Sequence, residues 1–164
     1  KKIGGNLIGL DTENIKPVNY LFFKNHNDVK DRSIDVLTCF ETLEHLNKNE
    51  KDEFFIFVNR VVKQKGKLVV SFPIIGGPFL ILKELRRRKI FKKSEYNLTE
   101  LIKASFFGKF PERSNDLKGS HKGFNFKDLV KEIENNYNIS QRIYSPFNYL
   151  PWFLNSQIFL VISL

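Results

Sequence analysis

The sequence contains no methionine, a single cysteine and a single tryptophan among its 164 residues. One thiol cannot form a disulfide within the chain, and no Cys/His spacing is typical of zinc motifs, so we expect no metal site. The longest apolar run, around Pro78–Leu82, is far too short to cross a bilayer. Together with the lack of a signal peptide pattern, these absences predict a cytoplasmic protein.

Acidic residues are also scarce: 18 Asp and Glu stand against 27 Lys and Arg, which gives a formal net charge of +9. A basic balance can indicate nucleic acid, an anionic membrane or an acidic substrate. It can equally reflect a composition rich in Lys, Asn, Ile and Phe. The hydrophobic fraction of 41% and the 17 phenylalanines predict a folded core. The length suits a single domain over residues 1–164.

Short apolar runs alternate with segments of helical periodicity along the chain. We expect strands at Leu7–Leu10, Val18–Phe23, Ile34–Phe40, Leu68–Phe72, Ile139–Tyr144 and Gln157–Leu164, and helices at Glu50–Val62, at Phe79–Ile90, from Leu98 and from Phe126. The pattern predicts an α/β fold with a doubly wound, Rossmann-like, mostly parallel sheet and helices on both faces. The short connection between the last two strands favours a C-terminal antiparallel hairpin. We expect Asn49 to cap the first helix, with Asp52 at its third position, and Gly66 to end that helical unit. Pro78 suits the first turn of the second helix, and the Asn97–Glu100 segment is expected to cap the third.

Two groups of residues follow strands at their carboxyl ends, where ligands bind in such sheets. Asp11 ends the first strand, and an acid there can accept both hydroxyls of a ribose, although it can also simply cap the next turn. Cys39, Phe40 and Glu41 lie at the end of what we expect to be a central strand. The thiol of Cys39 is expected to be a small buried filler, not a nucleophile.

Five segments, in this order and spacing, carry a resemblance to a known family. They are Gly9–Asp11, Ile34–Leu37, Glu41–Leu46 with its Leu-Glu-His element, Gly66–Pro73 and His121–Asn125. Together they resemble the class I S-adenosylmethionine-dependent methyltransferases, of the small-molecule "type 11" kind.

The resemblance implies the cofactor S-adenosylmethionine, with direct transfer of its methyl group to an oxygen, nitrogen or carbon nucleophile. It implies that Asp11 holds the ribose, that Asn25 or Asp28 contacts the adenine, and that Cys39, Phe40 and Glu41 wall the cavity. The spacing does not choose between Asn25 and Asp28. The family's first strand and its Gly-x-Gly-x-Gly loop are missing before Gly5, so the fold is expected to be N-terminally truncated.

Three histidines are present. His45 follows the third strand and is a candidate catalytic base because an imidazole titrates near neutral pH. In the family this residue is usually structural. Its neighbour Glu44 is expected to be a solvated acid at a helix start. His26 and His121 lie in polar segments and are expected at the surface. The resemblance also implies that the loop of His121 flanks the face where the methyl acceptor binds.

The segment Phe79–Lys93 combines apolar residues at helical spacing with a cationic cluster. Such a basic amphipathic helix is typical of peripheral membrane contact, whereas the plainer interpretation is a helix that packs on the sheet with a solvated basic face. We therefore expect a small-molecule, sugar or lipid-linked acceptor and no nucleic acid partner. The alternatives are a non-catalytic scaffold domain and a nicotinamide-dependent oxidoreductase of similar topology.

Overall fold

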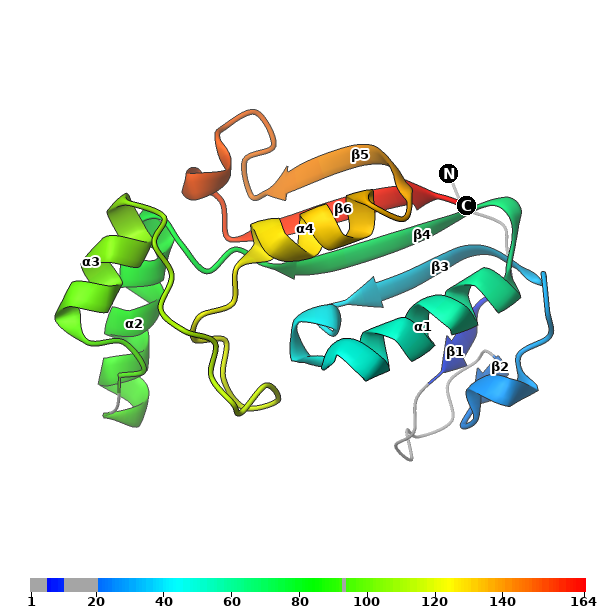
Figure 1. Cartoon of the computed structure of the whole chain (residues 1–164), viewed down its shortest axis with the longest axis horizontal. Coiled ribbons are helices and arrows are strands. Elements are labelled where there is room, and N and C mark those ends of the chain that lie inside the picture. The colour runs from blue at the N-terminus through cyan, green and yellow to red at the C-terminus, as the bar shows by residue number, and fades with distance from the viewer. Residues whose placement is uncertain (1–5, 11–20, 93) are drawn as a thin grey trace.

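A four-stranded sheet forms the centre of the computed structural model, which describes residues 6–10, 21–92 and 94–164 (Figure 1). Its strand order is β3–β4–β6–β5. The strands are β3 (Ile34–Phe40), β4 (Val62–Pro73), β5 (Asn138–Ser145) and β6 (Gln157–Ser163). β3 pairs with β4 in parallel, whereas β6 is antiparallel to both β4 and β5. The predicted α/β class and the C-terminal antiparallel hairpin are confirmed.

A second, two-stranded sheet precedes the main one in the sequence. It pairs β1 (Ile8–Leu10) with β2 (Leu21–Phe23) in parallel. Both strands fall within predicted ones, and the start of the predicted strand at Val18 lies outside the described residues. A short 3-10 turn, η1 (His26–Asp28), follows β2.

Two helices, α1 (Lys48–Val61) and α4 (Phe126–Glu134), lie on the same face of the main sheet (Figure 1). They bury apolar side chains against β4 and β6, because the strands point every second residue to this face. The fully or almost fully buried members of this core are Val58, Val61, Leu68, Val70, Phe72, Leu129, Ile133, Ile158, Leu160 and Ile162. Burial of these side chains is the main stabilising contribution to the fold.

β3 has a different environment from the one expected of a central strand. In the described part of the chain it lies at the edge of its sheet, with β4 as its paired neighbour. Val36 and Phe40, on one face of β3, are 53% and 50% exposed. The apolar run over β3 correctly predicted a strand, but it did not reveal which residues are covered.

The first helix begins earlier than predicted. Asn47, not Asn49, is the N-cap: its side chain accepts a hydrogen bond from the backbone N–H of Glu50, and the Glu50 carboxylate accepts one from Asn47 N–H. This reciprocal capping box satisfies two N–H groups that the first helical turn leaves unpaired. Gly66 does not end the helical unit; it lies inside β4, where an added Cβ would meet Asp35 O at 3.0 Å.

The next two helices, α2 (Pro78–Phe91) and α3 (Leu98–Phe106), pack together beyond the carboxyl ends of β3 and β4 (Figure 1). Pro78 occupies the first turn of α2 and Asn97 caps α3 through a capping box with Glu100, as predicted. No described helix is both long enough and apolar enough to cross a membrane.

Candidate functional site

The site lies where the chain leaves β3. Glu41 adopts a positive φ of 50°, and its N–H donates to Ser71 O at 2.9 Å, which ties the turn to the end of β4. The chain then forms a single 3-10 turn, η2 (Leu43–His45). Leu43 is 1% exposed and anchors η2 in the core. This anchor fixes the direction of the next two side chains, Glu44 and His45.

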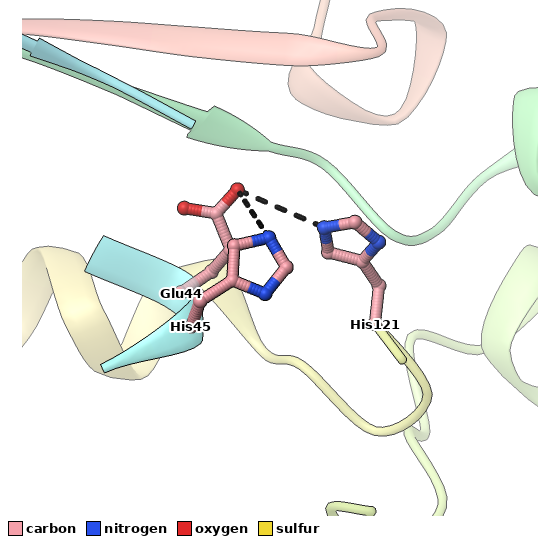
Figure 2. Close-up of side chains that lie close together, drawn as sticks. All are labelled: Glu44, His45 and His121. Carbon is pink, nitrogen blue, oxygen red and sulfur yellow. Dashed lines mark ion pairs between the residues drawn. The ribbon is translucent and has the colours of Figure 1, made fainter. Parts of the chain in front are cut away.

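Figure 2 shows that Glu44, His45 and His121 converge, and we call them the Glu-His-His cluster. Glu44 Oε1 lies 3.8 Å from His45 Nε2 and 3.7 Å from His121 Nε2. The Glu44 side chain is fully buried, whereas those of His45 and His121 are 25% and 40% exposed. The carboxylate of the cluster is therefore buried, and the two imidazoles lie between it and the solvent at an opening that we call the mouth of the cluster.

His121 reaches the cluster because the segment between α3 and α4 folds back onto η2. Arg113 holds this segment: Nη1 donates to Ser120 O at 2.9 Å and to Lys122 O at 3.1 Å, and Nη2 donates to Glu44 O at 2.9 Å. Burial lowers the pKa of Arg113, and the nearby Glu44 carboxylate opposes that shift. One guanidinium thus joins the segment that carries His121 to the turn that carries Glu44 and His45.

A second link orients His45. Its Nδ1 lies 2.7 Å from Leu117 O, a residue 72 positions later. A carbonyl oxygen can only accept, so Nδ1 carries the proton in this contact. In the neutral imidazole, Nε2 then presents its lone pair toward Glu44.

The polar atoms at the centre of the cluster are not satisfied. Within the part of the chain that the structure describes, Glu44 Oε1, Glu44 Oε2 and His121 Nε2 are buried and accept or donate no hydrogen bond. Buried polar groups in native proteins are nearly always paired, so three such atoms in one place require an explanation. The prediction of a solvated Glu44 is wrong, because its side chain is fully buried. His121 lies at the surface as predicted, with its side chain 40% exposed, but its Nε2 points into the cluster.

Sequence reasoning treated these residues one at a time, and so missed the cluster. The adjacent Glu44-His45 pair gave a local signal for a ligand or catalytic group. Nothing in the sequence linked it to His121, because the link depends on the fold-back of the segment that contains Arg113 and Leu117. His26 was predicted to lie at the surface, and the structure confirms that it is exposed.

The residues predicted to wall a cavity lie at the carboxyl end of β3 and just after it, before the turn that carries Glu44 and His45. Glu41 Oε1 accepts hydrogen bonds from Gln157 Nε2 at 2.7 Å and from Ser71 Oγ at 3.3 Å, which joins the ends of β3, β4 and β6. Phe40 contacts Phe159 edge-on with ring centroids 5.9 Å apart. Glu41 and Phe40 therefore flank the carboxyl end of β3, where α/β sheets bind their ligands.

Comparison with known proteins decides the kind of domain. Residues 11–70 match the family model described as "Methyltransferase domain". This match spans the strand β3, the cluster residues Glu44 and His45, and most of β4. This match agrees with the resemblance to the class I S-adenosylmethionine-dependent methyltransferases, and it supports S-adenosylmethionine as the cofactor.

Solved structures share the fold at low sequence identity. The PH0226 protein from Pyrococcus horikoshii OT3 is 13% identical with a TM-score of 0.59; the alignment covers 98% of this chain and 72% of that one. A protein assigned as an S-adenosylmethionine-dependent methyltransferase from Listeria monocytogenes is 12% identical, with a TM-score of 0.51 and coverage of 96% and 79%. A protein assigned as a type 11 methyltransferase from Sulfolobus solfataricus is 14% identical, with a TM-score of 0.50 and coverage of 96% and 69%.

No curated protein matches the chain. The domain match favours a methyltransferase over the nicotinamide-dependent oxidoreductase that shares the sheet topology. The solved structures show only that the fold is shared, because sequence identities of 12–14% are too low to assign a function to this chain.

The predicted cofactor-binding residues of the methyltransferase domain are only partly described. Asp11, predicted to hold the ribose, lies outside the described residues. Asn25 and Asp28 are exposed at η1, shortly after β2, and Asn25 is the N-cap of that turn: its side chain accepts a hydrogen bond from Asn27 N–H at 2.9 Å. Asp28 lies within the turn and Asn25 before it. Their assignment to adenine, and that of Cys39, Phe40 and Glu41 to the cavity wall, stays a prediction.

We expect Cys39 to react slowly with thiol reagents. Burial raises the pKa of the Cys39 thiol, a hydrogen bond with Thr42 lowers it in part, and the Glu44 carboxylate raises it further. The raised pKa means that less thiolate, the reactive form, is present at about pH 8 than in a free thiol. Since Cys39 is the one cysteine of the chain, alkylation by iodoacetamide reports on it alone.

The measurement is the alkylation rate between about pH 7 and pH 10, with glutathione as the reference thiol. We expect the Cys39 rate to stay below the glutathione rate at the lower end and to rise at higher pH. A rate equal to that of glutathione at about pH 8 would contradict the assignment of Cys39 as a buried filler.

Proposed function

We propose that this methyltransferase domain transfers the methyl group to a small-molecule, sugar or lipid-linked acceptor, and that the lipid-linked class is the one its surface favours. The observation that carries this proposal is the exposed surface of α2. Leu82, Leu85 and Ile90 are 60%, 55% and 56% exposed on this helix. Large apolar side chains at such exposure, when grouped, mark sites that contact another apolar surface.

Cationic residues lie on the same helix. Arg86, Arg88 and Lys89 are exposed, in the stretch between Leu85 and Ile90. Lys and Arg close to an anionic membrane each contribute about 1 kcal/mol of attraction, and apolar side chains enter the interface beside them. The combination supports peripheral membrane contact through α2, within the predicted segment Phe79–Lys93.

Large apolar side chains are also exposed on and after α3, the helix that packs against α2. Ile102, Phe106 and Phe107 are 43%, 65% and 69% exposed on α3 and just after it. In Figure 1 both helices lie beyond the carboxyl ends of β3 and β4. Glu41 and the turn η2, which carries Glu44 and His45, follow directly on the end of β3. A membrane contact there would bring a lipid-linked acceptor to the end of the sheet where ligands bind.

The test is sedimentation with vesicles of phosphatidylcholine and phosphatidylglycerol. We expect the chain to pellet with anionic vesicles and much less with pure phosphatidylcholine. The double variant Arg86→Glu and Arg88→Glu should lose most of this binding. Lys30→Glu with Lys48→Glu is the matched control, because both lysines are exposed and the change in net charge is the same.

An apolar pair of variants completes the test. Leu82→Gln with Leu85→Gln should weaken vesicle binding, whereas Ile56→Gln, on a 69% exposed residue of α1, should not. With tritiated S-adenosylmethionine and a membrane lipid extract, the label should enter the organic phase. If the α2 variants and their controls lost vesicle binding equally, the lipid-linked acceptor would be rejected. Tritium label that stayed in the aqueous phase would reject it as well.

A further inference from the structure

We propose that the Glu-His-His cluster binds a divalent transition-metal cation. Its three ligand atoms, one from each side chain, all lie within 4.8 Å of one another. Two imidazole nitrogens and one carboxylate oxygen form a ligand set typical of Zn²⁺ and related first-row metals. The proposal goes beyond methyl transfer, because the domain match assigns no metal to these residues.

The distances fit a site that closes slightly around an ion. Ligand atoms about 2.0–2.2 Å from a tetrahedral metal are roughly 3.4 Å apart. Glu44 Oε1 is 3.8 Å from His45 Nε2 and 3.7 Å from His121 Nε2. Movements of a few tenths of an ångström would bring each of these two pairs to that separation. Rotation of the two partly exposed imidazoles, whose ligand nitrogens lie within 4.8 Å of each other, would complete the coordination.

A direct ion pair between Glu44 and protonated histidines explains the geometry less well. Charge-assisted hydrogen bonds between nitrogen and oxygen measure about 2.7–2.9 Å, much shorter than the two separations here. Within the described residues the Glu44 carboxylate oxygens and His121 Nε2 have no hydrogen bond at all. A central cation would satisfy all three atoms at once.

The surroundings orient the ligands as metal sites require. His45 donates from Nδ1 to Leu117 O at 2.7 Å, which leaves Nε2 free to bind a cation. Such a hydrogen bond on the far ring nitrogen is the usual support of a ligating histidine. The charged side chain of Arg113 also contacts the cluster residues, but it donates to the backbone oxygen of Glu44 and not to its carboxylate. The negative charge of the carboxylate is thus directed at the two imidazoles.

Three protein ligands leave at least one coordination position open. The carboxylate is fully buried and the imidazoles are 25% and 40% exposed, so this position faces the mouth formed by His45 and His121. We place an acceptor hydroxyl there, a step that rests on the proposed function. The hydroxyl oxygen would bond to the methyl carbon, the carbon–sulfur bond would break with its electron pair on sulfur to give S-adenosylhomocysteine, and the hydroxyl proton would pass to water.

The first test is calorimetric titration of the full chain, stripped with chelator, with Zn²⁺ alone. We expect one binding site, and visible absorption bands of low-coordinate Co²⁺ when that ion is used instead. His121→Gln should lower the affinity at least about tenfold, and Glu44→Gln should do the same. His121 is partly exposed, so His121→Gln remains informative if Glu44→Gln, at a buried position, fails to fold.

His26→Gln is the matched control, since His26 is exposed and lies outside the cluster. It should bind Zn²⁺ as tightly as the parent chain. Absence of binding heat, or equal losses in His26→Gln and His121→Gln, would overturn the cation site. This test uses neither methyl donor nor acceptor, so a failed vesicle or transfer experiment leaves it unaffected.

A second measurement concerns the open position. Catechol, a small diol, should shift the Co²⁺ absorption bands of the parent chain because its oxygens enter the coordination sphere. Unshifted bands would mean that the sphere is closed, which would overturn the hydroxyl-binding role while leaving the cation site itself in place.

Discussion

Gly123→Ala is expected to destabilise the folded chain by about 2–4 kcal/mol and to weaken cation binding by the cluster. Gly123 has a φ of +74°, and an added Cβ would lie 2.3 Å from Glu112 O and 2.7 Å from Arg113 Cα. Both atoms belong to the backbone, so no side-chain rotation can relieve the clash. The segment between α3 and α4 would have to shift, and His121, two residues before Gly123, would shift with it.

Urea unfolding followed by circular dichroism measures the first effect, and Zn²⁺ calorimetry the second. Gly108→Ala is the matched control, because Gly108 also has a positive φ, of 61°, but has nothing within 4 Å of an added Cβ. Gly108→Ala should lower the free energy of unfolding by only about 1–2 kcal/mol, the penalty for placing a Cβ on a residue with positive φ. Equal losses in the two variants would show that the close approach at Gly123 does not matter.

Phe72→Ala is expected to cost about 3–5 kcal/mol, which for a chain of this size is a large part of the total stability. Phe72 is 0% exposed in β4 and contacts Phe124 edge-on, with ring centroids 6.1 Å apart. Truncation leaves a cavity between the sheet and the segment that leads into α4. Both the lost burial of the ring and the unfilled cavity contribute to the penalty.

The same unfolding measurement applies, with Phe106→Ala as the control. Phe106 lies on α3 and is 65% exposed, so the same chemical change should alter the free energy of unfolding by no more than about 0.5 kcal/mol. If Phe106→Ala were as destabilising as Phe72→Ala, the assignment of the core to the β4–β6 face would be wrong.

Several elements could be predicted because their signals are local. The apolar run in Gln157–Leu164 predicted β6, and the apolar spacing from Phe126 predicted α4. The Asn97-Glu100 pair predicted the start of α3. In each case the signal, whether an apolar run, a helical spacing or a capping pair, lies within the element or at its first turn.

Boundaries that depend on distant partners were predicted less well. β4 begins at Val62, six residues before the predicted Leu68, because Val62 pairs with Ile34 across the sheet. Asn47 and Asn49 are equally good capping residues by type. The entry of the chain from η2 into α1 selects Asn47, and the sequence around it does not reveal that direction.

By itself the sequence determined the order of strands and helices and the methyltransferase motifs after β3, because each depends on residues close together in the chain. The tertiary structure alone decided that Glu44 is buried and that His121 faces it. That outcome depends on Arg113 and Leu117, whose bonds to η2 span 69 and 72 positions. A contact across that length follows from how packed elements position the loops between them, which no local pattern of residues encodes.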